Sequence, residues 1–320
     1  MAHIGLQIPG FSYGVPDDRL FETVAGAARA AEDAGFDSVW VMDHFEQLPM
    51  LGGVDEPILE GYTTLAALAA RTSKVFLGTL VTGVTYRNPA LLAKMVTTLD
   101  VISAGRAILG IGAAWFEEEH EAYGYGPLLP AGERLDRMEE AIEICRRMFT
   151  EERASFEGRY YRIHEARNLP QPVQPGGPRI LIGGSGEKRT LRAVARFGDF
   201  CNLFGGPAQI RRKLDVLDKH CSEVGRDPSE ITRTGLLTVI IAPTQEAADV
   251  KRDAMLGAMG LTEEQASEFA VFGGPERIAE HVAERRAAGL DGMIVNLGNA
   301  DVADPELVAL AGEALKNAFA

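Results

Sequence analysis

Eight short apolar runs recur along the chain, and a segment with helical spacing of apolar residues separates each run from the next. The runs occupy residues 3–8, 37–43, 75–81, 106–111, 179–182, 200–203, 234–241 and 292–297. Strands that are apolar on both faces and joined by helices pair in parallel beneath a layer of helices. Eight such units in 320 residues predict one domain over 1–320, an α/β fold of the (β/α)8 TIM barrel type with insertions. A doubly wound open sheet is the alternative, because the repeat alone does not establish closure.

Two stretches interrupt the repeat. Residues 151–178 contain an aromatic segment at 156–161 followed by a proline-rich run, which indicates a hairpin and an extended connection. Residues 260–274 separate two predicted helices before the last strand. Long excursions from a compact barrel serve as lids or binding loops, or they form contacts between subunits. The sequence leaves both interpretations open.

Charge and composition narrow the classes of partner. The chain has 32 Lys and Arg against 46 Asp and Glu, a net charge of −14, which argues against nucleic acid or an anionic membrane as the main partner. The N-terminus lacks the basic and apolar regions of an export signal, and no apolar run is long enough to span a membrane. We therefore expect a cytoplasmic protein that acts on a small molecule.

Cysteine and histidine spacing gives no sign of a metal site. The three cysteines form no CxxC pair, and the histidines show neither HxH nor HExxH spacing. Cys145 and Cys221 fall within predicted helices, and no GxSxG motif is present, so an acyl-transfer nucleophile is not expected. The acidic run 117–119 is interpreted as the solvated start of a helix.

The active site of a TIM barrel lies where its strands end, so the residues after each run are the candidates. The second run ends at Asp43 and His44, and a histidine in this place either acts as a general acid or base or is a polar residue at the barrel mouth. The fourth run ends with a G-x-G at Gly110 and Gly112, which is a weak dinucleotide fingerprint. Because it stands at the fourth unit rather than the first, we do not expect a nicotinamide site.

A glycine-rich segment follows the fifth run and leads into a predicted helix. It reads Gly183, Gly184, Ser185 and Gly186, with Lys188 two residues further on. Backbone N–H groups at the start of a helix bind phosphate, and a hydroxyl and an ammonium group can assist. The segment therefore indicates either a phosphate site or a tight turn required by packing.

Taken together, several segments resemble the bacterial luciferase-like superfamily. They are WVMDHF at 40–45, YRNP at 86–89, LD and SAGR within 99–106, GIGAAW at 110–115, GGSG at 183–186 and DFCN at 199–202. The match keeps the same order over nearly the whole chain. Within the superfamily, the sequence is most similar to the branch that uses the deazaflavin coenzyme F420.

The resemblance implies roles for individual residues. In F420-dependent sugar-phosphate dehydrogenases an Asp–His pair after the second strand contacts the deazaflavin, and the histidine handles the substrate proton. Those positions are Asp43 and His44 here. The family also carries a non-prolyl cis peptide bulge at the end of the third strand, which supports the deazaflavin ring. In this chain it would fall within the segment Thr79, Leu80, Val81 and Thr82.

Further cofactor contacts are implied at the ends of the fourth and fifth strands. Ala113 and Ala114 should run beside the cofactor, and the segment Gly184, Ser185 and Gly186 should hold its phosphate. The basic residues near that segment are candidates for binding the acidic tail of the cofactor. They are Lys188, Arg189 and Arg192.

Two departures from the sugar-phosphate dehydrogenases bear on the substrate. Trp115 stands where those enzymes have a catalytic glutamate, and Leu48 stands where they have a tryptophan. A glucose 6-phosphate substrate is therefore not expected. We expect instead an apolar substrate pocket with few charges, although each side chain could simply pack the barrel rim. Its residues would be Phe11, Leu48, Trp115 and Phe204, with Met50, Leu51 and Phe116 nearby.

These observations lead to one functional hypothesis and two alternatives. The hypothesis is an F420-dependent oxidoreductase that transfers a hydride between C5 of the deazaflavin and a small, apolar alcohol or carbonyl compound, with His44 moving the proton. One alternative is an FMN-dependent monooxygenase supplied by a separate flavin reductase. The other is a flavin-binding barrel without catalysis. The family resemblance also favours a homodimer.

Overall fold

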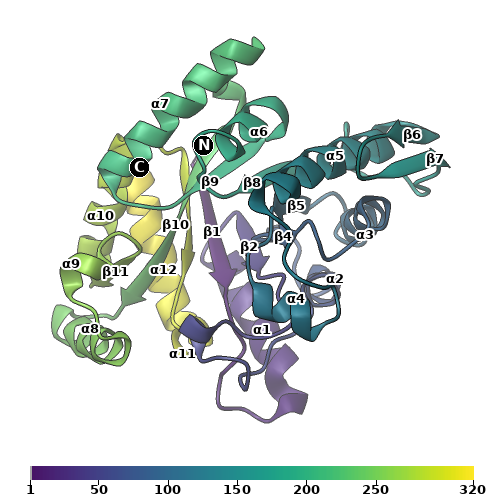
Figure 1. The fold of residues 1–320 in the computed structure, drawn as a ribbon. Coiled ribbons are helices and arrows are strands. Elements are labelled where there is room, and N and C mark those ends of the chain that lie inside the picture. Colours follow the sequence, from purple (N-terminus) through teal and green to yellow (C-terminus); the bar gives the residue numbers. More distant parts are fainter. Residues whose placement is uncertain (1) are drawn as a thin grey trace.

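The computed structural model describes residues 2–320, and its central feature is a closed ring of eight parallel strands (Figure 1). The strands are β1 (His3–Ile8), β2 (Ser38–Val41), β3 (Phe76–Thr79), β5 (Ala107–Gly112), β8 (Arg179–Gly183), β9 (Phe200–Leu203), β10 (Thr232–Ile241) and β12 (Gly292–Asn296). β1 pairs with both β2 and β12, and β9 pairs with both β8 and β10, so the ring has no open end. The predicted barrel is confirmed, and the open sheet is excluded.

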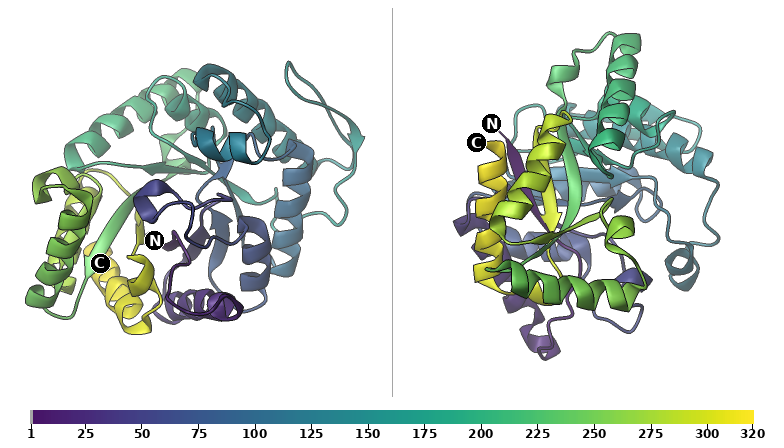
Figure 2. Two further views of the ribbon diagram at one scale, coloured as in Figure 1. Left: turned by 60° about the horizontal axis from the view of Figure 1, so that its bottom comes forward. Right: turned by 90° about the vertical axis from the view of Figure 1, so that its left-hand side faces the viewer.

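Nine helices of eight or more residues surround the strands in the described part of the chain (Figure 2). They are α1 (Asp17–Asp33), α2 (Gly61–Ala69), α3 (Pro89–Ile102), α5 (Ala131–Thr150), α6 (Thr190–Phe197), α7 (Pro207–Val224), α8 (Gln245–Met259), α10 (Pro275–Ala287) and α12 (Pro305–Phe319). Local sequence sets their starts: for example, the side chain of Asn88 caps α3, and Pro89 stands in its first turn. Among the described residues, no helix is long and apolar enough to cross a membrane.

Short elements occupy the connections. They are α4 (Glu117–Ala122), α9 (Glu263–Ala266), α11 (Asn299–Val302), the two 3-10 turns η1 (Pro49–Leu51) and η2 (Pro228–Glu230), and the two-residue strand β4 (Thr82–Gly83). α6 begins at Thr190 and not at Glu187 as predicted, because residues 187–189 form a turn. This shift moves the start of the helix away from the glycine-rich segment.

Side chains from the strands fill the interior of the barrel. Alternate residues of the strands point inward, and Trp40, Ile108 and Phe200 pack together with Leu80, Leu181 and Ile294. Trp40 is completely buried, and its Nε1 donates a hydrogen bond to the hydroxyl of Ser38 at 2.7 Å. A larger apolar core lies between the strands and the helices. Because these side chains fill the interior of the barrel, space for a ligand remains at the carboxyl ends of the strands.

Both interruptions of the repeat contain regular structure. Residues 151–178 include an antiparallel hairpin of β6 (Ala154–Glu157) and β7 (Arg162–Ala166), which extends away from the barrel (Figure 1). Residues 260–274 include α9 and a strand, β11 (Ala270–Gly273), which pairs in parallel with the carboxyl half of β10. The sequence did not predict β11, because a four-residue apolar run inside a presumed loop gives little periodicity.

Candidate active site

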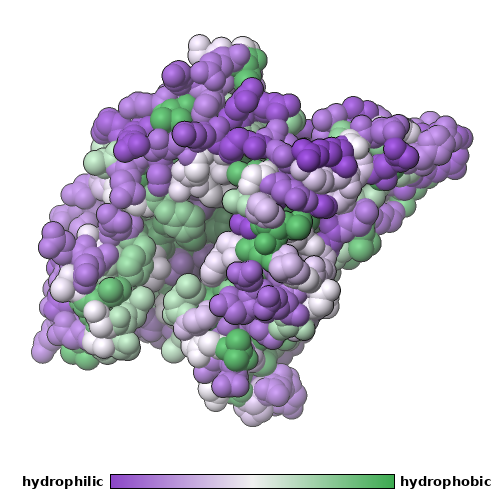
Figure 3. Space-filling model, viewed as in Figure 1, coloured by the Kyte–Doolittle hydropathy of each residue, from purple (hydrophilic) through white to green (hydrophobic). Residues whose placement is uncertain are grey.

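A cavity of about 1010 Å³ opens at the carboxyl ends of the strands. Figure 3 shows hydrophobic residues in the hollow at the centre of this face. Ten of the predicted site residues line the cavity: Asp43, His44, Leu48, Leu80, Val81, Ala113, Ala114, Trp115, Gly184 and Phe204. The other six lie outside its lining: Phe11, Thr79, Thr82, Ser185, Gly186 and Lys188. The structure thus brings together residues from five strand ends that are far apart in the sequence.

His44 follows β2 and is held by a buried carboxylate. Its Nδ1 lies 3.0 Å from Oε2 of Glu119, a residue in α4 whose side chain is fully buried. The backbone N–H groups of Phe45 and Glu46 donate to Oε1 of the same carboxylate, and the hydroxyl of Tyr86 donates to Oε2. The interpretation of residues 117–119 as a solvated helix start is therefore wrong for Glu119, although Glu117 and Glu118 are exposed.

Packing at the start of α4 explains why Glu119 reaches His44. Phe116, directly before the helix, is buried against Met42 and Leu48 and anchors α4 over the end of β2. Glu119 lies in the first turn of this helix, facing the loop after β2. The rings of Trp115 and Phe116 approach the His44 ring edge-on, with centroid distances of 5.9 and 6.0 Å.

Two effects act in opposite directions on the Glu119 carboxyl. Burial raises its pKa, while the hydrogen bonds from His44, Tyr86 and the Glu46 backbone lower it. The hydrogen bonds prevail, so the pKa of Glu119 lies below its ordinary value. The group is therefore a carboxylate at neutral pH and accepts all of these hydrogen bonds.

Asp43 is part of a buried ion pair in the cavity wall. Its two oxygens accept hydrogen bonds from Arg87 at 2.6 and 2.8 Å, and Arg87 also donates to Glu60 at 2.6 Å. The guanidinium lies 4.9 Å from the ring centre of Tyr62. Burial raises the pKa of Asp43, and the hydrogen bonds and charge of Arg87 oppose the shift. Arg87 thus stabilises the charged form of a carboxyl that has little access to water.

The chain bulges between β3 and β4, and the peptide bond from Leu80 to Val81 is cis, within the predicted segment. Two glycines make room for Val81: a Cβ on Gly112 would lie 2.7 Å from its side chain, and one on Gly183 would lie 2.8 Å from it. These glycines therefore serve packing at the ends of β5 and β8.

Three hydroxyl groups contact one another on the side of the bulge that faces away from the cavity. Thr79 and Thr82 are buried, with their Oγ1 atoms 2.6 Å apart, and the hydroxyl of Tyr62 lies 2.7 Å from Thr82. This placement explains why the two threonines lie outside the cavity lining while Leu80 and Val81 line it.

Only part of the segment after β8 lines the cavity. Gly184 lines the cavity with a φ of 107°, and the next cavity residue is Thr190, the first residue of α6. Lys188 is exposed, and Arg189 forms ion pairs with Asp136 and Glu139 at 2.6 and 3.1 Å. Sequence reasoning missed Thr190, although a hydroxyl residue four positions after the GGSG segment was a usable signal.

Most of the remaining cavity wall is apolar. Leu48, Trp115 and Phe204 line it, whereas Phe11 is buried beside Tyr13 and contributes to the core. α8 covers the opposite side, which was not predicted from the sequence. Its contributions are Lys251, Ala254, Met255, Ala258 and Met259.

Few charged groups reach the cavity. Lys251 is the one cation among the described residues that line it, and its Nζ lies 2.8 Å from Oδ1 of Asp301. Among the uncharged polar residues of the lining, the side-chain amide of Asn296 donates to the side chain of Gln7, which in turn donates to the carbonyl of Leu80. A ligand in this cavity would meet mainly hydrocarbon, with polar groups at defined points.

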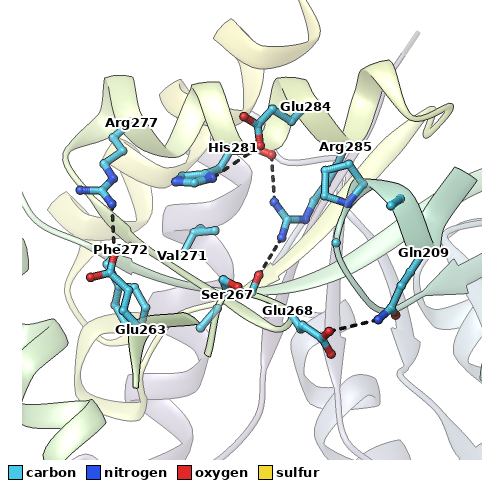
Figure 4. A pocket seen from close by; sticks show the side chains of 14 residues that line it. Gln209, Glu263, Ser267, Glu268, Val271, Phe272, Arg277, His281, Glu284 and Arg285 are labelled. Carbon is cyan, nitrogen blue, oxygen red and sulfur yellow. Dashed lines mark hydrogen bonds and ion pairs between the residues drawn. The ribbon is translucent and has the colours of Figure 1, made fainter. Parts of the chain in front are cut away.

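A smaller cavity of about 380 Å³ lies between α7, α9, β11 and α10 (Figure 4). Its polar side chains are engaged with one another: Arg277 contacts Glu263, His281 contacts Glu284, and Gln209 contacts Glu268. The guanidinium of Arg285 donates to backbone carbonyls. No group of side chains in the described residues could hold a metal ion. The large cavity is therefore the candidate active site.

Comparison with known proteins gives the family. The model of the luciferase-like monooxygenase family matches residues 12–266. The chain belongs to this family. The assignment makes it an enzyme of an oxidoreductase family and accords with the resemblance predicted from the sequence.

Individual relatives within the family differ in their chemistry. The chain is 33% identical over 250 residues to an F420-dependent glucose-6-phosphate dehydrogenase of Kineococcus radiotolerans, covering 76% of this chain and 71% of the relative. A solved F420-dependent secondary alcohol dehydrogenase, bound to an F420–acetone adduct, has a TM-score of 0.81 at 20% identity and covers 100% and 99% of the two chains. A monooxygenase from Streptomyces bottropensis has a TM-score of 0.79 at 24% identity, with 98% and 97% covered. The solved structures share the fold of this family member.

Proposed function

We propose that this family member is an F420-dependent oxidoreductase that transfers a hydride between C5 of the deazaflavin and an uncharged, apolar alcohol or carbonyl compound. The observation that carries the proposal is His44, backed by a buried carboxylate and lining a mainly apolar cavity. Similarity to an F420-dependent dehydrogenase supports the choice of cofactor. Asp43 and His44 retain their proposed roles as cofactor contact and proton-transfer residue.

The volume and lining of the cavity suit the deazaflavin. Leu80, Val81 and Ala113 offer an apolar surface to a flat ring, and Gly184 presents backbone without a side chain. We assign the phosphate to the segment after β8, where the hydroxyl of Thr190 and the start of α6 provide donors. Lys188, which is exposed two residues before Thr190, is the candidate we propose for binding the acidic tail.

The residues of the chain would perform the following tasks. When bound, F420 supplies a two-electron carrier that accepts or donates a hydride at C5. His44 takes the hydroxyl proton from an alcohol, or returns it to a carbonyl oxygen, through Nε2. The apolar walls, including Trp115 and Phe204, exclude water and hold the reacting carbon in place.

Titration of the purified protein tests the cofactor. We expect F420 to bind with a micromolar or lower dissociation constant and FMN to bind much more weakly, as followed by fluorescence or heat. The opposite preference, together with oxygen consumption in the presence of reduced FMN, would replace the proposal with the monooxygenase alternative. If neither cofactor binds, the barrel without catalysis is the better account.

The same protein tests the substrate class under anaerobic conditions. We expect F420 to be reduced by apolar secondary alcohols and not by glucose 6-phosphate, because the cation in the cavity is already paired with Asp301. Turnover of glucose 6-phosphate, without turnover of the alcohols, would overturn the substrate assignment and leave the cofactor assignment intact.

We also propose a homodimer formed through α2 and α3. α3 exposes the apolar side chains of Leu91, Val101 and Ile102, and the neighbouring α2 is mostly buried and has no charged residue. Exposed apolar side chains that gather on one helix are typical of a site of association. Light scattering should give twice the mass of the chain, and L91E combined with I102E should give the monomer. V224E, which alters an exposed valine at the end of α7, is the matched control and should remain dimeric.

A further inference from the structure

The Glu119 carboxylate uses its whole capacity for hydrogen bonding. Oε1 accepts from the backbone N–H groups of Phe45 and Glu46, and Oε2 accepts from Tyr86 and His44. An ionised carboxylate accepts about four hydrogen bonds and donates none. The ring nitrogen facing it must therefore be a donor, which assigns the proton of neutral His44 to Nδ1.

A proton on Nδ1 leaves the lone pair of the neutral ring on Nε2. His44 lines the cavity, so this nitrogen is the one available to a substrate hydroxyl. We propose that Glu119 is a positioning residue that holds His44 in the Nδ1–H tautomer, keeps its ring in place and stabilises the imidazolium formed when Nε2 takes a proton. The inference rests on the proposed function for the role of His44 in turnover, and on the hydrogen bonds alone for the tautomer.

The other groups around His44 do not impose this tautomer. The carboxyl of Asp43, the preceding residue, accepts hydrogen bonds from Arg87 with both of its oxygens. Tyr86 contacts Glu119 and not the histidine, while Trp115 and Phe116 present ring edges. Glu119 is thus the acceptor that determines which nitrogen of His44 carries the proton.

The substitution E119Q reverses the hydrogen-bonding pattern with little change in shape. The backbone N–H groups of Phe45 and Glu46 require an acceptor, so the glutamine oxygen has to face them. Its NH₂ group then faces Nδ1 of His44 and the oxygen of Tyr86, and it donates to both. We expect His44 to move its proton to Nε2, which removes the lone pair from the cavity.

Nitrogen-15 NMR of the imidazole ring measures the tautomer without cofactor or substrate. In its neutral form, the His44 ring of the wild-type protein should show a protonated Nδ1 and an unprotonated Nε2, and that of E119Q should show the reverse. Turnover of E119Q should fall about 10² to 10⁴-fold, the range for loss of a correctly oriented base. E118Q changes an exposed glutamate one position earlier in α4 and should alter neither measurement.

The outcomes separate this inference from the proposed function. A neutral wild-type His44 with its proton on Nε2, or a neutral His44 in E119Q that keeps the proton on Nδ1, overturns the role of Glu119. If E119Q does not fold, the spectrum of the wild-type protein alone still tests the tautomer of His44. Failure of the protein to bind F420 overturns the proposed function while the tautomer assignment is judged on the spectra alone.

Discussion

Replacing His44 by alanine is expected to lower turnover with F420 and the substrate by about 10² to 10⁴-fold. The variant loses the only described imidazole that lines the active-site cavity, and with it the group proposed to accept the hydroxyl proton. Anaerobic measurement of F420 reduction gives the rate. Because the cavity keeps its apolar surface, the affinity for F420 should change far less than the rate.

A matched substitution separates the loss of this histidine from the loss of any histidine. His164 lies exposed in the hairpin strand β7, outside the candidate site. H164A should retain wild-type turnover. Unchanged turnover of H44A on the true substrate would exclude His44 as the proton-transfer residue.

Replacing Arg87 by methionine is expected to destabilise the fold by about 3 to 5 kcal/mol, the cost of leaving a buried charge without its partner. Arg87 donates two hydrogen bonds to Asp43 and one to Glu60, and methionine offers no donor. Denaturant unfolding measures the change. R71M removes an exposed ion pair with Glu22 and should change the free energy of unfolding by less than about 1 kcal/mol.

The effect of Arg87 should depend on pH in a defined direction. Burial raises the pKa of Asp43 above its unfolded value, and removal of Arg87 takes away the opposing interaction. Stability associated with Asp43 is then fully present below the unfolded pKa and is lost as the pH rises through the folded pKa. R87M should therefore lose most stability at neutral pH and least in acid. Equal loss at both would show that the ion pair is not the cause.

The repeat in the sequence was sufficient to predict the barrel. Strands buried on both faces are continuously apolar, so all eight strands of the ring overlap the predicted runs. β11 escaped notice because its four residues lie beyond a short helix and pair with only part of β10. The start of α6 was placed too early, because a turn of three residues resembles the first turn of a helix.

The sequence was sufficient to predict those site residues that directly follow a strand. Asp43 and His44 follow β2, so their place at the barrel mouth depends on topology alone. Glu119 contacts a residue 75 positions away in the sequence, and Arg87 contacts one 44 positions away. No local sequence pattern predicts either contact. In the run of three glutamates, burial of the third depends on how α4 packs over β2, which only the folded structure shows.

The fit of Val81 between Gly112 and Gly183 links three separate strand ends. A methyl group added at either glycine would occupy the volume of the valine side chain, so these positions can vary only in concert. Evolution or redesign of this barrel mouth has to exchange the three residues as a set, trading a larger side chain at one position against a smaller one at another.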